Sequence, residues 1–173
     1  MEPVPTIAEA AREIAARRLS PVELTRACLD RIARIDPALR SFLLVTEERA
    51  MADARAAEAR VVRGEAKGPL DGIPVAHKDL FETAGIRTTA HSRLLADHVP
   101  ARDATVVARL AGAGTVLLGK LAMHEFAMGG HAFDLPWPQP VNPWDPERTT
   151  AGSSSGTAAG ELPRPGRAQA LDG

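Results

Sequence analysis

The sequence predicts an α/β fold, because helical and extended patterns alternate along it. Apolar residues recur at helical spacing through most of residues 6–63. Two short apolar runs, residues 73–77 and 115–118, are typical of buried strands. A helical pattern over residues 103–113 separates these runs, and a helix between two strands favours their parallel pairing.

Each of the first two predicted helices begins with a recognisable capping sequence. Thr6 and Glu9 have the spacing of a capping box. Ser20 is a second candidate N-cap, and Pro21 follows it at the first helical position. We expect the Asp-Pro pair at residues 36–37 to end the second helix.

The rest of the first sixty residues predicts a strand and a third helix. Residues 41–45 form a short apolar run that predicts the strand. Residues 47–63 are rich in alanine and charged residues, which predicts a helix closed by Gly64. The later apolar run at residues 73–77 carries Pro74 near its beginning, where a strand tolerates proline.

The second half of the chain predicts a further helix and a long irregular loop. After the strand at residues 115–118, we expect Gly119 and Lys120 to turn into another helix that continues through Phe126. Residues 131–146 contain five prolines and two tryptophans, which predicts an irregular loop whose tryptophans anchor it to the domain.

Length and composition fit one globular domain and argue against several kinds of partner. The 21 basic and 22 acidic residues give a net charge of −1, which argues against a nucleic-acid-binding surface. Cys28 is the only cysteine, which excludes an intrachain disulfide and favours a reducing compartment. No apolar run is as long as a membrane span, and the N-terminus does not resemble a signal peptide. We therefore expect a cytoplasmic protein that contacts neither nucleic acid nor membrane.

Residues 152–157, Gly-Ser-Ser-Ser-Gly-Thr, place several hydroxyls and backbone amides close together. Such a segment in isolation is more often a flexible linker. Here Ala158 and Ala159 follow as if a helix begins at once, and a helix N-terminus suits anion or oxyanion binding. No lysine stands between Gly156 and Thr157, so the P-loop pattern is absent and nucleotide binding is disfavoured.

The chain has only three lysines, and two of them end or follow apolar runs. Burial at the strand end would favour the neutral form of Lys78 and let it act as a base. The residues alone favour the alternative, in which Lys78 reaches solvent or pairs with Asp79. We interpret Lys120 as part of a structural ion pair or a helix N-terminal contact. Four histidines without metal-ligand spacing are interpreted as structural or surface residues, so we expect no metal and no cofactor: His77, His91, His124 and His131.

Six segments together, in order and in spacing, resemble the amidase signature family. The resemblance runs from about Pro21 to Ala159 and implies that family's fold, with a helical N-terminus followed by a mixed sheet flanked by helices, of which the chain holds an incomplete, N-terminal part. The segments are Gly68-Pro-Leu-Asp-Gly-Ile-Pro-Val-Ala-His-Lys78-Asp79, Asp103-Ala-Thr-Val-Val, Gly112-Ala-Gly-Thr-Val-Leu-Leu-Gly-Lys120, Glu125-Phe-Ala-Met-Gly, Asn142-Pro-Trp-Asp and Gly152-Ser-Ser-Ser-Gly156.

The resemblance implies hydrolysis or transfer at a carboxamide by a Ser–cis-Ser–Lys triad. It assigns the base to Lys78 and the bridging serine, which follows a cis peptide bond, to Ser153. Ser154 is then an auxiliary hydrogen-bonding residue. A neutral, desolvated lysine can take a serine proton, and a second serine is the smallest relay between them. The loop that lines the acyl pocket in the family falls on Ala127, Met128, Gly129 and Gly130.

The chain departs from the family pattern after the serine cluster. The family's attacking serine lies in a later Gly-Gly-Ser-Ile-Arg-like motif, which these 173 residues lack. We interpret residues 1–160 as the N-terminal part of an amidase domain. Residues 161–173 form an Arg-, Pro- and Gly-rich tail, which we expect to be disordered and to follow a lost reading frame. His91 and Ala151 stand where a glycine is usual. We expect the polypeptide alone to be inactive.

Three functions remain open from the sequence. The leading one is an amidase that acts on a small amide substrate. The second is the amidase subunit of a tRNA-dependent amidotransferase, which works with partner subunits. The third is a non-catalytic fragment, because a partial sheet leaves open edges. The partners expected besides the amide are either a second copy of the chain or the amidotransferase subunits.

Overall fold

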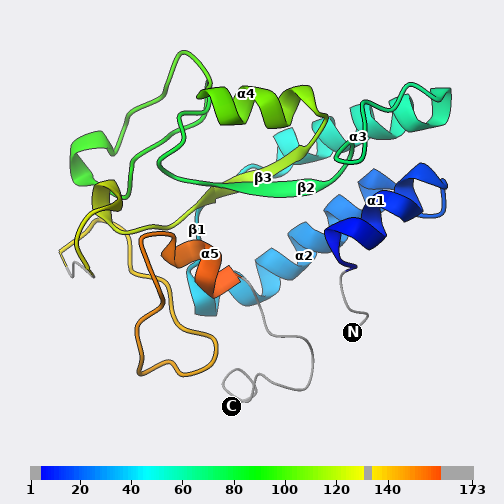
Figure 1. The fold of residues 1–173 in the computed structure, drawn as a ribbon. Helices are drawn as coiled ribbons and strands as arrows, with labels where there is room; N and C mark the ends of the chain where they lie inside the picture. Colours follow the sequence, from blue (N-terminus) through cyan, green and yellow to red (C-terminus); the bar gives the residue numbers. More distant parts are fainter. Residues whose placement is uncertain (1–4, 131–133, 161–173) are drawn as a thin grey trace.

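The computed structural model describes residues 5–130 and 134–160, and in them helices flank a three-stranded sheet (Figure 1). The strand order is β1-β3-β2. β1 (Phe42–Val45) pairs antiparallel with the central β3 (Val116–Leu121), and β2 (Pro74–Lys78) pairs parallel with it. The predicted α/β class and the parallel pairing of the two apolar runs are confirmed. The predicted tail, residues 161–173, lies outside the described residues.

The predicted helix starts are confirmed by their caps. The side chain of Thr6 accepts from the backbone of Glu9, whose carboxylate accepts from Thr6 in return. The hydroxyl of Ser20 accepts from the next helix's first turn. Gly64 ends the third helix in the left-handed conformation, φ 75°. These helices are α1 (Ile7–Ala15), α2 (Pro21–Leu39) and α3 (Glu47–Arg63).

The prediction that residues 36–37 end α2 is wrong, because the helix includes Pro37 and reaches Leu39. The carboxylate of Asp36 accepts from the backbone amides of Ser41 and Phe42, at 2.7 and 3.3 Å, and thus fixes the turn that follows. Proline removes one backbone donor, which in the last turn costs a single intrahelical hydrogen bond and does not end the helix at once.

The helix predicted from Gly119 through Phe126 is also wrong. Gly119 and Lys120 belong to β3, and a short 3₁₀ turn, η2 (Glu125–Ala127), follows after it. A Cβ at Gly119 would overlap the backbone carbonyl oxygen of Leu44 on β1. Glycine is therefore needed for the close approach of two strands here, and it does not mark a helix start. The predicted helix at residues 103–113 is present as α4 (Thr105–Gly112).

The core joins the helices to the sheet through small and aliphatic side chains. In Figure 1, α4 lies above the strands, and α1 and α2 lie below them. The alanines of α3 let that helix approach β3 closely. One cluster contains Leu29, Ala50, Met51, Ala54, Val116 and Leu118, and the other contains Ala10, Ile14, Leu24, Val61 and Ile73. This packing holds the sheet in place, and loops follow the carboxyl ends of β2 and β3.

The two tryptophans of the proline-rich segment behave differently. The guanidinium of Arg87 lies 5.5 Å from the centre of the Trp137 ring, and His91 Nε2 lies 3.2 Å from the carbonyl oxygen of Trp137. Trp144 is 55% exposed. The predicted anchoring is therefore confirmed for Trp137 and wrong for Trp144. No helix in the described part of the chain has the length and apolar character needed to cross a membrane.

Candidate active site

Lys78 and Ser153 lie in direct contact although 75 residues separate them in the sequence. Lys78 is the last residue of β2. Its Nζ donates a hydrogen bond of 2.7 Å to the hydroxyl of Ser153. The carboxyl end of a parallel strand opens towards the connecting loops, which makes it a usual place for functional side chains. The two residues that the family resemblance assigns to base and bridge are thus brought together.

The serine segment is held by backbone contacts to the end of β3. The peptide bond between Gly152 and Ser153 is cis, as the resemblance implies. The backbone N–H of His124 donates to the carbonyl oxygen of Ser153 at 2.9 Å. The N–H of Gly156 donates to the carbonyl oxygen of Ala122 at 2.8 Å. The short helix α5 (Ser155–Gly160) begins directly after these contacts, so the segment is an ordered turn and not a linker.

His124 connects the serine segment with the loop assigned to the acyl pocket. A Cβ at Gly152 would overlap the imidazole of His124, so this ring packs directly against the serine segment. Its Nδ1 lies 3.1 Å from the carbonyl oxygen of Gly129. The loop residue Met128 is 71% exposed, and Ala127 has a left-handed φ of 60°. The sequence predicted a structural or surface position for His124, but not its place beside the serine segment, because that place depends on a contact between distant segments.

Asp79 does not pair with Lys78, although it is the next residue. Its Oδ1 lies 3.1 Å from the Nζ of Lys120, and its Oδ2 accepts from the N–H and hydroxyl of Thr89 at 2.8 and 2.6 Å. The side chains of Asp79 and Lys120 are each 1% exposed. The interpretation of Lys120 as part of a structural ion pair is confirmed. The interpretation of Lys78 as a partner of Asp79 is wrong.

Burial lowers the pKa of Lys78 below its ordinary value. The ammonium form loses hydration there, so the neutral amine gains weight. Because Asp79 faces Lys120, its carboxylate does not offset this effect through an ion pair with Lys78. A lysine with a lowered pKa can act as a general base towards a serine hydroxyl that lies within hydrogen-bond distance.

Ser154, His91 and His77 lie in structural surroundings, whereas His131 lies outside the described residues. The carbonyl oxygen of Ser154 accepts from the N–H of Ala158 in the first turn after the serine cluster. His91 is fully buried, and its Nδ1 lies 2.6 Å from the carbonyl oxygen of Met123. Burial lowers the pKa of His77, and the charge of Lys120 lowers it further. In residues 5–130 and 134–160, no group of three or more His, Cys, Asp or Glu side chains could hold a metal ion.

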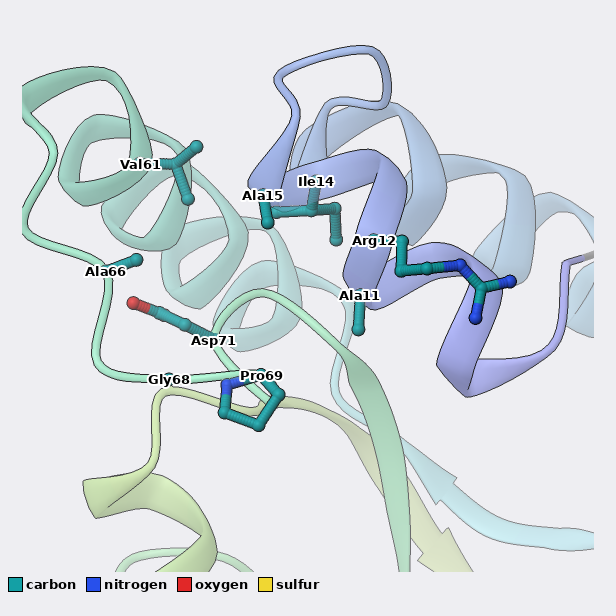
Figure 2. A pocket seen from close by; sticks show the side chains of 9 residues that line it. All are labelled: Ala11, Arg12, Ile14, Ala15, Val61, Ala66, Gly68, Pro69 and Asp71. Carbon is teal, nitrogen blue, oxygen red and sulfur yellow. The ribbon is translucent and has the colours of Figure 1, made fainter.

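A cavity of about 400 Å³ lies elsewhere, between α1, the end of α3 and residues 66–71 (Figure 2). Apolar side chains such as Ile14 and Val61 line it. The carboxylate of Asp71, at its edge, is bound by the guanidinium of Arg60. None of the residues assigned to the triad lines this cavity. It therefore offers apolar surface without a reactive group.

The chain is similar to known proteins of one family. The model of the family described as Amidase matches residues 23–160. The chain belongs to the amidase family. A glutamyl-tRNA(Gln) amidotransferase subunit from Azotobacter vinelandii is 52% identical over 154 residues, which are 89% of this chain and 32% of that protein. The corresponding subunit from Chloroflexus aggregans is 50% identical over the same shares.

Solved amidase structures share the fold. The native peptide amidase from Stenotrophomonas maltophilia matches with a TM-score of 0.81 and 33% identity, over 91% of this chain and 34% of its own. A chain from a vestigial protein complex, described with the evolutionary origins of an s-triazine catabolic enzyme, matches with a TM-score of 0.84 and 37% identity, over 90% and 34%. The chain thus spans about a third of the length of the relatives that it matches.

Proposed function

We propose that this chain supplies the base and the relay of an amidase site, with Lys78 as the base and Ser153 as the bridging serine. The observation that carries the proposal is the 2.7 Å hydrogen bond between Lys78 Nζ and Ser153 Oγ. Membership of the amidase family supports it. Residues 1–160 are, in this proposal, the N-terminal part of the amidase domain.

In the proposed reaction, neutral Lys78 accepts the proton of the Ser153 hydroxyl, which in turn accepts the proton of an attacking serine. The attacking oxygen bonds to the carboxamide carbon, the proton returns through the relay to the leaving nitrogen, and the C–N bond breaks. Water, deprotonated by the same relay, then hydrolyses the acyl-serine. Ser154 serves as an auxiliary hydrogen-bonding residue.

The proposal assigns the acyl pocket to residues 127–130. Support comes from the imidazole of His124, which bridges the carbonyl oxygen of Gly129 and the serine segment. A shift of the pocket loop would therefore be transmitted to Ser153, whose carbonyl oxygen accepts from the same histidine.

The attacking serine belongs, in this scheme, to a segment that these 173 residues do not contain, because the motif that carries it is absent from them. The purified 173-residue polypeptide is then expected to release no ammonia from simple amides. Turnover that disappears in Lys78→Ala would contradict this expectation and would place a complete site within the chain.

A chimera tests the roles of the residues directly. Residues 23–160 replace the matching segment of the Azotobacter vinelandii protein, and amide hydrolysis is measured. Lys78→Ala in the chimera should lower the rate by at least about 100-fold, the usual contribution of a general base. Lys67→Ala, at an exposed lysine outside the site, is the control. An active chimera that Lys78→Ala leaves unchanged would refute the base assignment.

A second candidate function is the amidase subunit of a tRNA-dependent amidotransferase. The 52% identity to a subunit of glutamyl-tRNA(Gln) amidotransferase favours it. The test is co-purification of the tagged chain with partner subunits from its own cells. A cytoplasmic location belongs to the same proposal, since the single cysteine suits a reducing compartment.

A further inference from the structure

We propose that Lys120 is a positioning residue, which holds the carboxylate of Asp79 on the side of β2 opposite Ser153 and so leaves Lys78 without an anionic partner. The inference deepens the proposed function, because it rests on Lys78 as the base. It assigns to a buried ion pair the task of keeping the neighbouring amine free for proton transfer.

The strand register separates the two lysines. β2 and β3 pair Lys78 with Leu121 and His77 with Lys120. The backbone N–H of Asp79, the first residue of the turn after β2, still donates to the carbonyl oxygen of Leu121 at 3.0 Å, which keeps Asp79 in register with β3. Successive side chains of an extended segment point to opposite faces. Asp79 therefore shares a face with His77 and Lys120, while Lys78 faces the serine segment.

The contacts of Asp79 and Lys120 leave neither group free to turn. Thr89 binds one carboxylate oxygen of Asp79 through its N–H and its hydroxyl, and Lys120 lies 3.1 Å from the other oxygen. The ammonium of Lys120 also donates to the hydroxyl of Thr88 at 2.5 Å and to the carbonyl oxygen of Phe81 at 3.0 Å. The partners of Lys120 in these contacts all lie in residues 79–89, the turn and loop that follow Lys78.

The charges around the pair balance without Lys78. Asp79 and Lys120 together carry no net charge, whether the shared proton lies on the amine or on the carboxylate. Burial lowers the pKa of Lys120, and the carboxylate of Asp79 opposes this effect. His77 faces the same pair, and its pKa is lowered by burial and by Lys120, while Asp103 acts in the opposite direction. The residues of β2, β3 and α4 include no carboxylate, and Asp53 of α3, which lines a small cavity with His77, is paired with Arg49.

Loss of the Lys120 charge should therefore act on Lys78. The carboxylate of Asp79, next to Lys78 in the chain, would lose its cation and stabilise the ammonium form of Lys78. An ammonium group has no lone pair and cannot accept the proton of Ser153. Lys78 can thus act as a base only while Lys120 remains paired with Asp79.

The test is an NMR titration of the lysine side chains in the 173-residue chain, which has only three lysines to assign. Lys120→Met should raise the pKa of Lys78 by up to about 1, since a shift of about 1 is the lower end of the effect of an opposite charge within about 4–6 Å and Asp79 faces away from Lys78. The double variant Asp79→Asn/Lys120→Met removes both charges and should return the pKa to its wild-type value. Lys67→Met, at an exposed site, should leave it unchanged.

Two results would overturn the inference: a pKa of Lys78 that does not rise in Lys120→Met, or one that stays raised in the double variant. A pKa that stays raised in the double variant would be explained by loosened packing alone, because added hydration of Lys78 also favours its ammonium form. If Lys120→Met does not fold, the carboxyl carbon signal of Asp79 in the unchanged chain decides. The chemical shift of this carbon should change at the pH at which Lys120 titrates. A change at the pH at which Lys78 titrates would refute the inference. An ordinary pKa of Lys78 in the unchanged chain would instead contradict the proposed function, while the difference between variants still decides the role of Lys120.

Discussion

The helical part of the chain, residues 7–63, and the strand-end region around Lys78 are stabilised in different ways. In the helical part, the ion pairs between its own residues are largely solvent-exposed, as in Arg26 and Glu47, whose side chains are 51% and 63% exposed. The buried positions there are mostly apolar. In the strand-end region, Asp79 and Lys120 form an ion pair with 1% of each side chain exposed. Stability is spread over many weak contacts in the first region and depends on a few strong ones in the second.

The largest expected effect is that of Asp79→Ala. This change leaves Lys120 buried without its carboxylate, which should lower the free energy of unfolding by about 3–5 kcal/mol. Glu47→Ala breaks an exposed pair and should cost at most about 1 kcal/mol. Urea denaturation of both variants measures the difference. Equal losses would show that burial does not distinguish the two regions.

A smaller effect is expected at the N-cap of α1. Thr6→Ala removes the hydroxyl that accepts from Glu9 in the capping box and should cost about 1 kcal/mol. Arg55→Ala, at an exposed position of α3, is the control and should change stability by less. Thermal unfolding followed by circular dichroism measures both. A cap variant as costly as Asp79→Ala would contradict the comparison.

The smallest effect concerns the pH dependence that Lys78 contributes. Its pKa is lowered by burial, so between that value and the ordinary value the unfolded chain binds more protons than the folded one. Stability relative to Lys78→Met should therefore rise as the pH increases through that window. Urea denaturation at about pH 8 and about pH 10.5 compares a pH well below the ordinary lysine pKa of about 10.4 with one close to it. A relative stability that falls with rising pH would mean that Lys78 gains an anionic partner in the folded chain.

The same comparison explains what the sequence could predict. The caps at Thr6 and Ser20 and the left-handed Gly64 are local signals, since every interacting group lies within a few residues. The role of Gly119 was not predictable, because the reason for this glycine is the carbonyl oxygen of Leu44 on another strand.

The site shows the same limit. The residues alone favoured a Lys78 that reaches solvent or pairs with its neighbour Asp79, whereas Asp79 in the structure contacts Lys120. The contact between Lys78 and Ser153 was expected from the family resemblance and not from the residues, because it joins segments 75 residues apart. The contact of His124 with the serine segment was not predicted for the same reason, since its ring and backbone meet a segment distant in the sequence.

The most direct test of the central claim is the pKa of Lys78 in the unchanged chain, measured by NMR on its side-chain nitrogen. The account predicts a value below the ordinary value of about 10.4, because burial disfavours the ammonium form and Asp79 is bound by Lys120. A value at or above the ordinary one would mean that Lys78 is a charged lysine, either solvated or paired with an anion, and the proposed base would then be contradicted.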